Sequence, residues 1–383
     1  MNGTIYMPVG EVCSSISDTY REKKNMVTLI NTSDVLEGRV LNHERVPNSN
    51  LKGQFKKTFQ RDDILYSEIR PQNRRFAYVD FSPIDYIAST KLMVIRAKKD
   101  VVSPKYLYYF LKNSSTVAEL QLLAETRSGT FPQITFSEVA NLTIPVPSLA
   151  VQEVIVQTMQ CLEDKITCNE QINDNLADLL QTIYQERFGN DILAVNQGVL
   201  SDICSYSRDK VAVSELNVRT YFSTENMLSG KAGSTEATSL PTTSQTTACH
   251  KGDTLISNIR PYFKKIVYCE DKCGCSTDVL CFTPSQPCYS AYLFSTLYAD
   301  KFFAFMVAGS KGTKMPRGDK QQIMTYPVVL PSEEELAGFN TIASPLLEQI
   351  YSNRAENKRL SILRDTLLPK LMSGEIDVSA VQL

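Results

Sequence analysis

Basic and amide side chains crowd around one proline in the first part of the chain, and their types suit contact with a nucleic acid. The densest run is Arg70-Pro71-Gln72-Asn73-Arg74-Arg75. Lys and Arg neutralise phosphates, and Arg, Asn and Gln can form paired hydrogen bonds with base edges in the major groove. A plain solvated basic surface is the competing interpretation of such runs. The chemistry indicated is therefore recognition of a polyanion.

Basic side chains recur around a second proline, Pro261, and give two sets of candidate DNA contacts. The first set is Lys56, Lys57, Arg61, Arg70, Gln72, Asn73, Arg74, Arg75 and Arg127. The second set is Arg260, Lys264, Lys265, Lys311, Lys314, Arg317 and Lys320. Arg70 and Arg260 both follow a predicted strand, which indicates either a shared DNA contact or a shared structural salt bridge. We expect about half of the other basic residues to touch DNA, because exposed cations are common on any surface.

Six of the ten cysteines lie between Cys249 and Cys288, next to His250. Their C-x3-C-x-C spacing is not a common zinc knuckle and no paired C-x2-C motifs occur, so we predict free thiols and no metal. With only two histidines in the chain, a His-based catalytic dyad is poorly supplied. Gly230–Thr235 lacks the spacing of a phosphate-binding loop, and no glycine-rich cofactor loop follows a strand. We predict a chain without catalytic residues or a cofactor of its own.

Composition indicates a globular protein with no membrane span. The 383 residues are 43% hydrophobic and 21% charged, which suits two or three domains. No apolar run reaches the length of a membrane span and no signal-peptide pattern occurs, so we expect a cytoplasmic protein with reduced cysteines. Residues 1–150 and 190–330 are mildly basic, whereas residues 151–189 and 331–383 are acidic. Basic modules suit a polyanion better than acidic segments do, although chance fluctuation also explains the difference.

The chain repeats itself with a period of about half its length. Asp63–Pro71 matches Asp253–Pro261, and Thr28–Gly38 resembles Thr220–Gly230. A period this long indicates a duplicated domain rather than a solenoid. Within each copy, short alternating segments that end in Arg-Pro predict strands followed by turns, mixed with a few helices. We predict an α+β fold of two duplicated α/β modules.

Each module is followed by a long amphipathic helix. In the first helix the apolar stripe and its Asn positions comprise Ile166, Asn169, Asn173, Leu176, Leu180 and Ile183. In the second helix they comprise Ile350, Asn353, Asn357, Leu360, Leu367 and Leu371, widened by Leu363 and Leu368. Such helices need a partner, and we expect them to pair as a coiled coil; separate packing of each helix on its own module is the alternative. The predicted segments are module 1–147, helix 148–189, module 190–331 and helix 332–383.

The helix ends carry local signals. Ser332 and Glu335 have the spacing of a capping box, which the first copy lacks, and Gly374 follows the last apolar residue as a helix stop. Pro345 lies inside the second helix, where we expect a kink or a restart.

Leu363–Ile376, LRDTLLPKLMSGEI, resembles the C-terminal helix signature of the specificity subunits of type I restriction–modification systems. The duplicated order of module and helix supports the resemblance across nearly the whole chain. It implies two target-recognition domains that each read half of a split DNA sequence. It also implies that the two helices pair antiparallel, set the spacing between the domains and dock the partner subunits.

The same resemblance implies partners that carry the chemistry. Two methyltransferase subunits would bind S-adenosylmethionine and methylate adenine at N6, and a restriction and translocase subunit would use ATP and Mg. The chain itself has no Asn-Pro-Pro-Tyr or Asp-Pro-Pro-Tyr motif, which adenine methyltransferases of this kind use. A DNA-cleaving or DNA-modifying enzyme with its own active site, and a coiled-coil scaffold without a DNA role, are the alternative functions.

Overall fold

The computed structural model describes residues 4–49, 53–126, 132–189 and 196–378. The chain forms two compact units. Unit 1 comprises Met1–Thr167 and Asn357–Leu383, and unit 2 comprises Cys168–Glu356. The units differ from the four segments expected from sequence, because each contains one module together with parts of both long helices.

Unit 1 has two four-stranded sheets, in the strand orders β2-β11-β8-β9 and β6-β3-β10-β7. Its strands are β1 (Ile5–Pro8), β2 (Cys13–Ile16), β3 (Met26–Ile30), β4 (Val35–Leu36), β5 (Arg39–Val40), β6 (Val46–Pro47), β7 (Phe55–Lys57), β8 (Ile64–Ser67), β9 (Phe76–Tyr78), β10 (Tyr86–Ser89), β11 (Leu92–Ala97) and β12 (Thr143–Val146). Its shorter helices are α1 (Val9–Val12), α2 (Pro104–Lys112), α3 (Ser114–Thr126) and α4 (Phe136–Asn141).

Unit 2 repeats this plan, with sheets in the orders β14-β21-β18-β19 and β15-β17-β20-β16. Its strands are β13 (Gln197–Val199), β14 (Cys204–Tyr206), β15 (Lys210–Ala212), β16 (Tyr221–Phe222), β17 (Gln245–Cys249), β18 (Thr254–Ser257), β19 (Ile266–Tyr268), β20 (Cys273–Cys275), β21 (Val279–Pro284) and β22 (Pro327–Val329). Its shorter helices are α6 (Leu200–Ile203), α7 (Ser290–Tyr298), α8 (Asp300–Ala308) and α9 (Lys320–Met324). The aromatic-rich residues 290–308 are divided between α7 and α8.

The central strands of both units are buried on both faces, which explains their apolar sequences. In β8, Ile64 and Tyr66 pack toward the helices and Leu65 packs toward the second sheet. In β18, Ile256 packs toward the helices and Leu255 packs toward the second sheet. Successive side chains of a strand point to opposite faces. Each unit therefore has three layers: helices, a central antiparallel sheet and a smaller second sheet.

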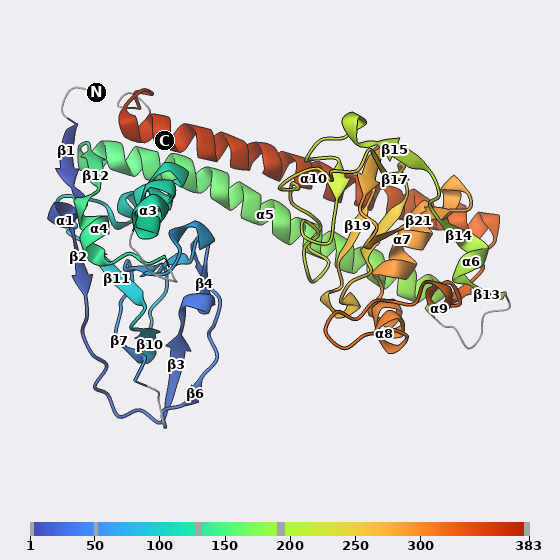
Figure 1. The fold of residues 1–383 in the computed structure, drawn as a ribbon, viewed down its shortest axis with the longest axis horizontal. Coiled ribbons are helices and arrows are strands. Elements are labelled where there is room, and N and C mark those ends of the chain that lie inside the picture. The colour runs from blue at the N-terminus through green and yellow to red at the C-terminus, as the bar shows by residue number, and fades with distance from the viewer. Residues whose placement is uncertain (1–3, 50–52, 127–131, 190–195, 379–383) are drawn as a thin grey trace. The chain divides into compact units, whose positions relative to one another are not determined.

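The two long helices, α5 (Leu149–Phe188) and α10 (Glu333–Ser373), pair antiparallel (Figure 1). In unit 2, Asn353 Nδ2 donates to Asn173 Oδ1 at 2.9 Å, and Asn169 Nδ2 donates to Glu356 Oε2 at 2.7 Å. In unit 1, Asn357 Nδ2 donates to the Ile166 carbonyl at 3.2 Å. Residue numbers rise along α5 while those of their partners fall along α10. The expected two-helix pairing and the antiparallel direction implied by the resemblance are confirmed.

Apolar side chains of the helix pair extend the core of each unit. In unit 1 the core cluster includes Met159 from α5 and Leu368, Leu371 and Met372 from α10. In unit 2, the rings of Tyr184 and Phe188 pack against those of Phe339 and Tyr292 in edge-to-face and tilted arrangements. Leu176, Ile183, Leu360 and Leu367 are half-buried. Leu363, expected to widen the stripe, is 44% exposed, so the stripe is narrower there than the sequence indicates.

The helix ends follow their local sequence signals. Ser332 and Glu335 form the expected capping box, with Ser332 N donating to Glu335 Oε2 at 2.8 Å and Glu335 N donating to Ser332 Oγ at 3.3 Å. Gly374 adopts the left-handed backbone (φ 79°) that ends a helix. The restart expected at Pro345 was wrong, because α10 continues through that residue.

Candidate nucleic-acid interface

The central strands β8 and β18 each end in an Arg–Pro turn, residues 70–74 in unit 1 and residues 260–264 in unit 2. Arg70 and Arg74 have left-handed φ values of 45° and 51°, and Arg260 and Lys264 have φ values of 50° and 51°. Non-glycine residues avoid this region because Cβ meets the backbone there, at a cost of about 1–3 kcal/mol per residue. The same strained turn is thus built twice, and such strain concentrates at ligand-binding sites.

A second segment is held against each turn by backbone hydrogen bonds. Arg70 N donates to the Pro132 carbonyl at 3.1 Å, and Arg260 N donates to the Pro316 carbonyl at 2.8 Å. The two segments, residues 128–132 and 311–316, each contain a Gly-Thr pair and occupy corresponding positions in the two copies of the sequence. Residues 127–131, including the candidate Arg127, lie outside the described residues. In unit 2 this arrangement brings the loop that carries Lys311, Lys314 and Arg317 beside the Arg–Pro turn.

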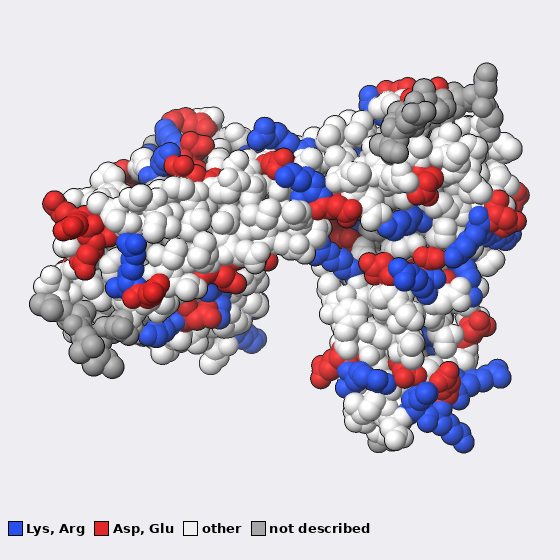
Figure 2. Space-filling view, turned by 180° about the vertical axis from the view of Figure 1, so that it is seen from behind, with Lys and Arg blue, Asp and Glu red and all other residues white. Residues whose placement is uncertain are grey.

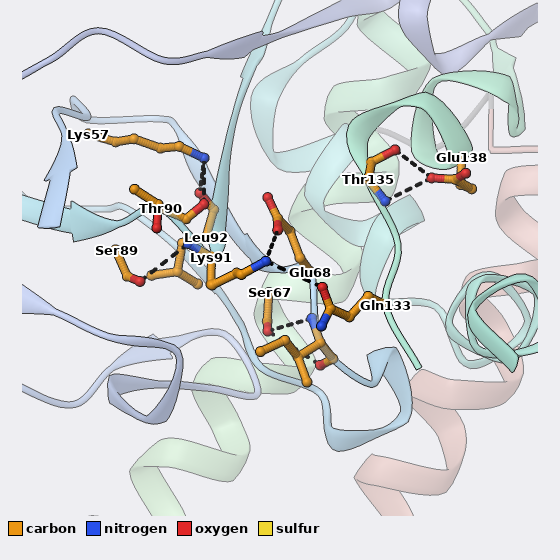
Figure 3. Close-up of polar contacts among 11 residues, drawn as sticks. Lys57, Ser67, Glu68, Ser89, Thr90, Lys91, Leu92, Gln133, Thr135 and Glu138 are labelled. Atoms are coloured by element: carbon orange, nitrogen blue, oxygen red, sulfur yellow. Dashed lines mark hydrogen bonds and ion pairs between the residues drawn. The ribbon is translucent and has the colours of Figure 1, made fainter. Parts of the chain in front are cut away.

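Polar side chains fix the base of each turn. Figure 3 shows Lys91 of unit 1 between Glu68 and Gln133, with its ammonium 3.5 Å from Glu68 Oε2 and 3.3 Å from Gln133 Oε1. At the corresponding place in unit 2, Arg317 pairs with Asp278 at 3.0 Å. A polar link is retained although the side chains that form it differ, so Arg317 has a structural partner as well as an exposed position.

Several candidate cations are used by the fold itself. Arg75 Nη1 donates to the Ser33 carbonyl at 3.0 Å, and Lys265 Nζ donates to the Thr224 carbonyl at 2.5 Å, so both tie their turn to an equivalent loop. Burial lowers the pKa of Lys265. Arg74 Nη2 donates to Ser114 Oγ at 2.8 Å. These contacts were not foreseen from the sequence, because they depend on residues 40 or more positions away.

Lys264 docks its turn onto a helix as Arg74 does. Its ammonium lies 3.0 Å from Asp300, the first residue of α8, just as Ser114 is the first residue of α3. Lys231 also pairs with Asp300, at 2.7 Å. Hydrogen bonds from the two lysines lower the pKa of Asp300. The Arg–Pro turns of both units are therefore anchored to a helix start, through Arg74 in unit 1 and through Lys264 in unit 2.

Lys56 and Lys57, adjacent in sequence, have different environments. Lys57 Nζ donates to the carbonyls of Thr90 and Leu92, at 3.1 and 2.8 Å, and burial lowers its pKa (Figure 3). Lys56 is exposed. Lys57 thus holds β7 beside the β10–β11 connection through these hydrogen bonds, whereas the exposed Lys56 side chain can contact a ligand.

The other candidates are exposed or partly exposed. Arg61, Arg70, Gln72, Asn73, Lys314 and Lys320 belong to this group. Lys311 is exposed as well, but it pairs with Asp319 at 2.6 Å. Arg260 Nη2 lies 3.5 Å from the Lys314 carbonyl, and its buried Nε has no acceptor among the described residues. A buried donor without an acceptor is uncommon.

Two exposed aromatic residues of unit 2 were not among the candidates. Tyr262 and Phe263 occupy the centre of the Arg–Pro turn and are 49% and 38% exposed. They align with Gln72 and Asn73 of unit 1 at the same offset as the preceding prolines. A search for cations and amides passes over them, but the alignment of the two copies identifies their positions.

On the face drawn in Figure 2, surface charge by itself does not mark an interface. On the face that Figure 2 shows, Lys and Arg are interspersed with Asp and Glu on each unit. The repeated turns therefore carry the assignment, and the charge of individual modules contributes little to it.

Most cysteines of unit 2 form part of its core, whereas Cys168 and Cys288 are exposed. Cys249, Cys269, Cys273, Cys275 and Cys281 are buried around the second sheet. Among the described residues, no group of three or more His, Cys, Asp or Glu side chains has the arrangement of a metal site. Cys13 and Cys204 occupy equivalent positions in the two units, and burial raises the pKa of each to about 12. Those two thiols are therefore packing groups at neutral pH.

Within the described part of the chain, no helix is long and apolar enough to cross a membrane.

Comparisons with known proteins agree on one family. Residues 6–177 match the type I restriction modification DNA specificity domain. The chain is 39% identical over 187 residues to the type I restriction enzyme HindI specificity subunit of Haemophilus influenzae, covering 49% of this chain but only 41% of that relative. It is 23% identical over 365 residues to the MjaIX specificity subunit of Methanocaldococcus jannaschii, covering 78% of this chain and 76% of the relative.

A solved structure shares the fold. The type I restriction–modification S subunit from M. genitalium matches with a TM-score of 0.54 at 17% identity, covering 98% of this chain and 97% of the other. The sequence matches, the repeated modules and the paired helices lead to one conclusion: the chain is similar to type I restriction–modification specificity subunits, and residues 6–177 match their DNA specificity domain.

Proposed function

We propose that this chain is the DNA-recognition subunit of a type I restriction–modification complex, in which each unit binds one half of a split target. The observation that carries the proposal is the repetition of one module. The matched specificity domain spans residues 6–177, and unit 2 rebuilds its sheets and its Arg–Pro turn. Two copies of one recognition module suit a target of two half-sites.

The division of labour between phosphates and bases follows from the side chains available. Exposed cations such as Lys56, Arg61 and Lys314 would neutralise phosphates and position each unit, since phosphate contacts carry no sequence information. Arg70, Gln72, Asn73 and Arg260 lie at the turns and would face base edges. Binding should weaken steeply with salt, because each neutralised phosphate releases counterions.

The chemistry would belong to partner subunits. Two methyltransferase subunits, loaded with S-adenosylmethionine, would methylate adenine at N6 within the target, and a restriction and translocase subunit would use ATP and Mg. The paired helices α5 and α10 would supply the docking surface and set the spacing of the half-sites. The complex would act in the cytoplasm, where the DNA lies.

The test is a long-read methylome of cells that carry the partner methyltransferase, with and without this chain. We expect one split, asymmetric methyladenine motif that disappears with the chain. The purified complex should bind that motif more tightly than a duplex with scrambled half-sites. The chain alone should neither cleave nor methylate DNA. An unchanged methylome together with equal binding of target and scrambled DNA would overturn the proposal.

A further inference from the structure

The Arg–Pro turns of the two units present different side-chain pairs at their centres. Unit 1 presents Gln72 and Asn73, both exposed. Unit 2 presents Tyr262 and Phe263, whose rings lie 4.8 Å apart at 60°. Large aromatic residues normally bury most of their surface, so two neighbouring exposed rings on one short turn require a reason.

The backbone beneath the two pairs is the same. Asn73 N donates to the Arg70 carbonyl at 2.8 Å, and Phe263 N donates to the Arg260 carbonyl at 2.9 Å. The next residue of each turn donates to the carbonyl of the proline, at 2.9 Å in both units. With left-handed residues at both ends, the turns present their central pairs on matching scaffolds. The difference between the units is therefore one of side-chain chemistry.

Both scaffolds are held rigidly. Each turn is fixed to the adjoining segment through its first residue and to a helix start through Arg74 or Lys264. Side chains on rigid supports discriminate ligands better than side chains on mobile loops. A turn that is anchored at both ends and exposes its central side chains is suited to discriminate between DNA bases.

The surroundings indicate what the exposed rings meet. Arg260 and Lys264 flank the aromatic pair directly, and the adjoining loop carries Lys311 and Lys314. An apolar pair with a cationic border suits a base edge beside phosphates. Lys264 and Lys311 already pair with Asp300 and Asp319. An apolar protein surface would offer no counter-charge to Arg260 and Lys314, which makes it the less favourable partner.

We propose that the two central side chains of each Arg–Pro turn set the base preference of that unit's half-site. Gln72 and Asn73 would favour adenine, because side-chain amides pair with its N6 and N7 atoms in the major groove. Tyr262 and Phe263 would favour thymine, whose methyl group offers the major groove an apolar contact. The inference rests on the proposed function and adds to it the residues that distinguish the two half-sites.

The test exchanges the pairs between the units in the complex with its methyltransferase partner. One variant carries Tyr262→Gln and Phe263→Asn, and the reciprocal variant carries Gln72→Tyr and Asn73→Phe. Each complex selects DNA from a pool with both half-sites randomised, and the selected sequences are compared. We expect the altered unit to change its preferred base at one or two positions by about tenfold or more. The other half-site should be unchanged, which serves as the control for folding and assembly.

A conservative variant separates the ring from the hydroxyl. Tyr262→Phe should keep the wild-type motif, because apolar contact does not need the phenol. Phe263→Asn alone, a single change in case the double exchange fails to fold, removes the apolar contact and should shift the preference at one base.

The outcomes are distinguishable. Both half-sites unchanged in the exchanged variants would overturn the inference, as would a uniform loss of affinity without a changed motif. If the wild-type complex itself selects no motif, the proposed function fails rather than this inference.

Discussion

Two aspartates at equivalent positions, Asp63 and Asp253, show how one site differs between the copies. Each accepts a backbone hydrogen bond from the residue three positions earlier, Gln60 N or His250 N, at 2.8 Å. Asp63 is also paired with Arg96 through two bonds of 2.7 Å. Among the described residues, no arginine pairs with Asp253. His250 Nδ1 and Cys281 Sγ lie 3.8 and 3.3 Å from its Oδ2, and burial raises the pKa of its carboxyl.

The two aspartates should therefore respond oppositely to substitution by asparagine. Asp63→Asn leaves Arg96 without its counter-charge, and we expect unit 1 to lose about 2–3 kcal/mol; the loss is smaller than for a fully buried pair because Arg96 is partly exposed. Asp253→Asn removes a buried carboxylate, so unit 2 should become more stable at neutral pH. Hydrogen exchange resolved by peptide would assign each change to its unit.

The pH dependence of the Asp253 effect has a definite sign. Below pH 3.8 the carboxyl is protonated in both the folded and the unfolded chain. As pH rises from 3.8 toward the raised folded pKa, the unfolded chain releases its proton first, and the free energy of unfolding falls. The advantage of Asp253→Asn should be absent below pH 3.8 and grow across this window. An advantage that is constant with pH would contradict the assignment.

Lys56 and Lys57 form a second matched pair at the residue scale. Lys57→Met removes two hydrogen bonds to backbone carbonyls, and we expect a loss of about 1–3 kcal/mol in the free energy of unfolding. Lys56→Ala should leave stability unchanged and, if Lys56 meets a phosphate as proposed, lower the slope of log affinity against log salt by about 1. Thermal melts and binding titrations at several salt concentrations separate the two effects. Equal destabilisation by both changes would show that the two lysines share a structural role.

At the scale of elements, the helix pair of unit 2 contains a buried amide contact. Asn173 and Asn353 are 8% and 6% exposed and share a hydrogen bond of 2.9 Å. Asn353→Leu would strand the Asn173 amide, at a cost of about 1–3 kcal/mol. Replacing both residues by Leu should recover most of that loss while weakening the register that paired polar groups specify. A double-mutant cycle from denaturant unfolding measures the coupling; a coupling near zero would mean that the amides act independently.

The elements that could be predicted from sequence are those specified locally. The long helices, the Ser332–Glu335 capping box and the stop at Gly374 follow from periodicity and end signals within a few residues. The duplicated strand and turn were likewise visible as matching segments. The exposure of Leu363 could not be predicted, because helical periodicity does not show which side of an apolar stripe the partner helix covers.

The roles of the basic residues were less predictable. Arg75 and Lys265 bind carbonyls of loops that are distant in sequence, and Lys57 binds two more. Nothing in a run of cations distinguishes such residues from exposed neighbours, since the acceptors are backbone atoms without a sequence signature. Tyr262 and Phe263 were missed for the converse reason, because aromatic residues in a turn are ordinarily core residues.

At the scale of the whole molecule, the antiparallel helices assign the two ends of the chain to the same unit. Residues 357–378 belong with the N-terminal module, and Leu368, Leu371 and Met372 lie in the same core cluster as Met159 and Val156. Unit 2 is built from one continuous stretch, Cys168–Glu356. The C-terminal signature segment therefore completes the module that is most distant from it in sequence.

A chain that ends after Glu356 should consequently damage unit 1 and spare unit 2. Removing the buried Leu368, Leu371 and Met372 exposes the apolar face of α5 in unit 1, and each lost large side chain costs about 2–5 kcal/mol. That sum is comparable to the whole stability of a typical domain, so residues 4–167 should become sensitive to protease while residues 196–356 stay protected. Limited proteolysis with mass spectrometry measures the protease sensitivity of both units in one experiment. As the matched control, Leu363→Ala changes an exposed residue of the same segment and should leave both units protected. Protection of the N-terminal module in the truncated chain would mean that the module folds without the C-terminal part of α10.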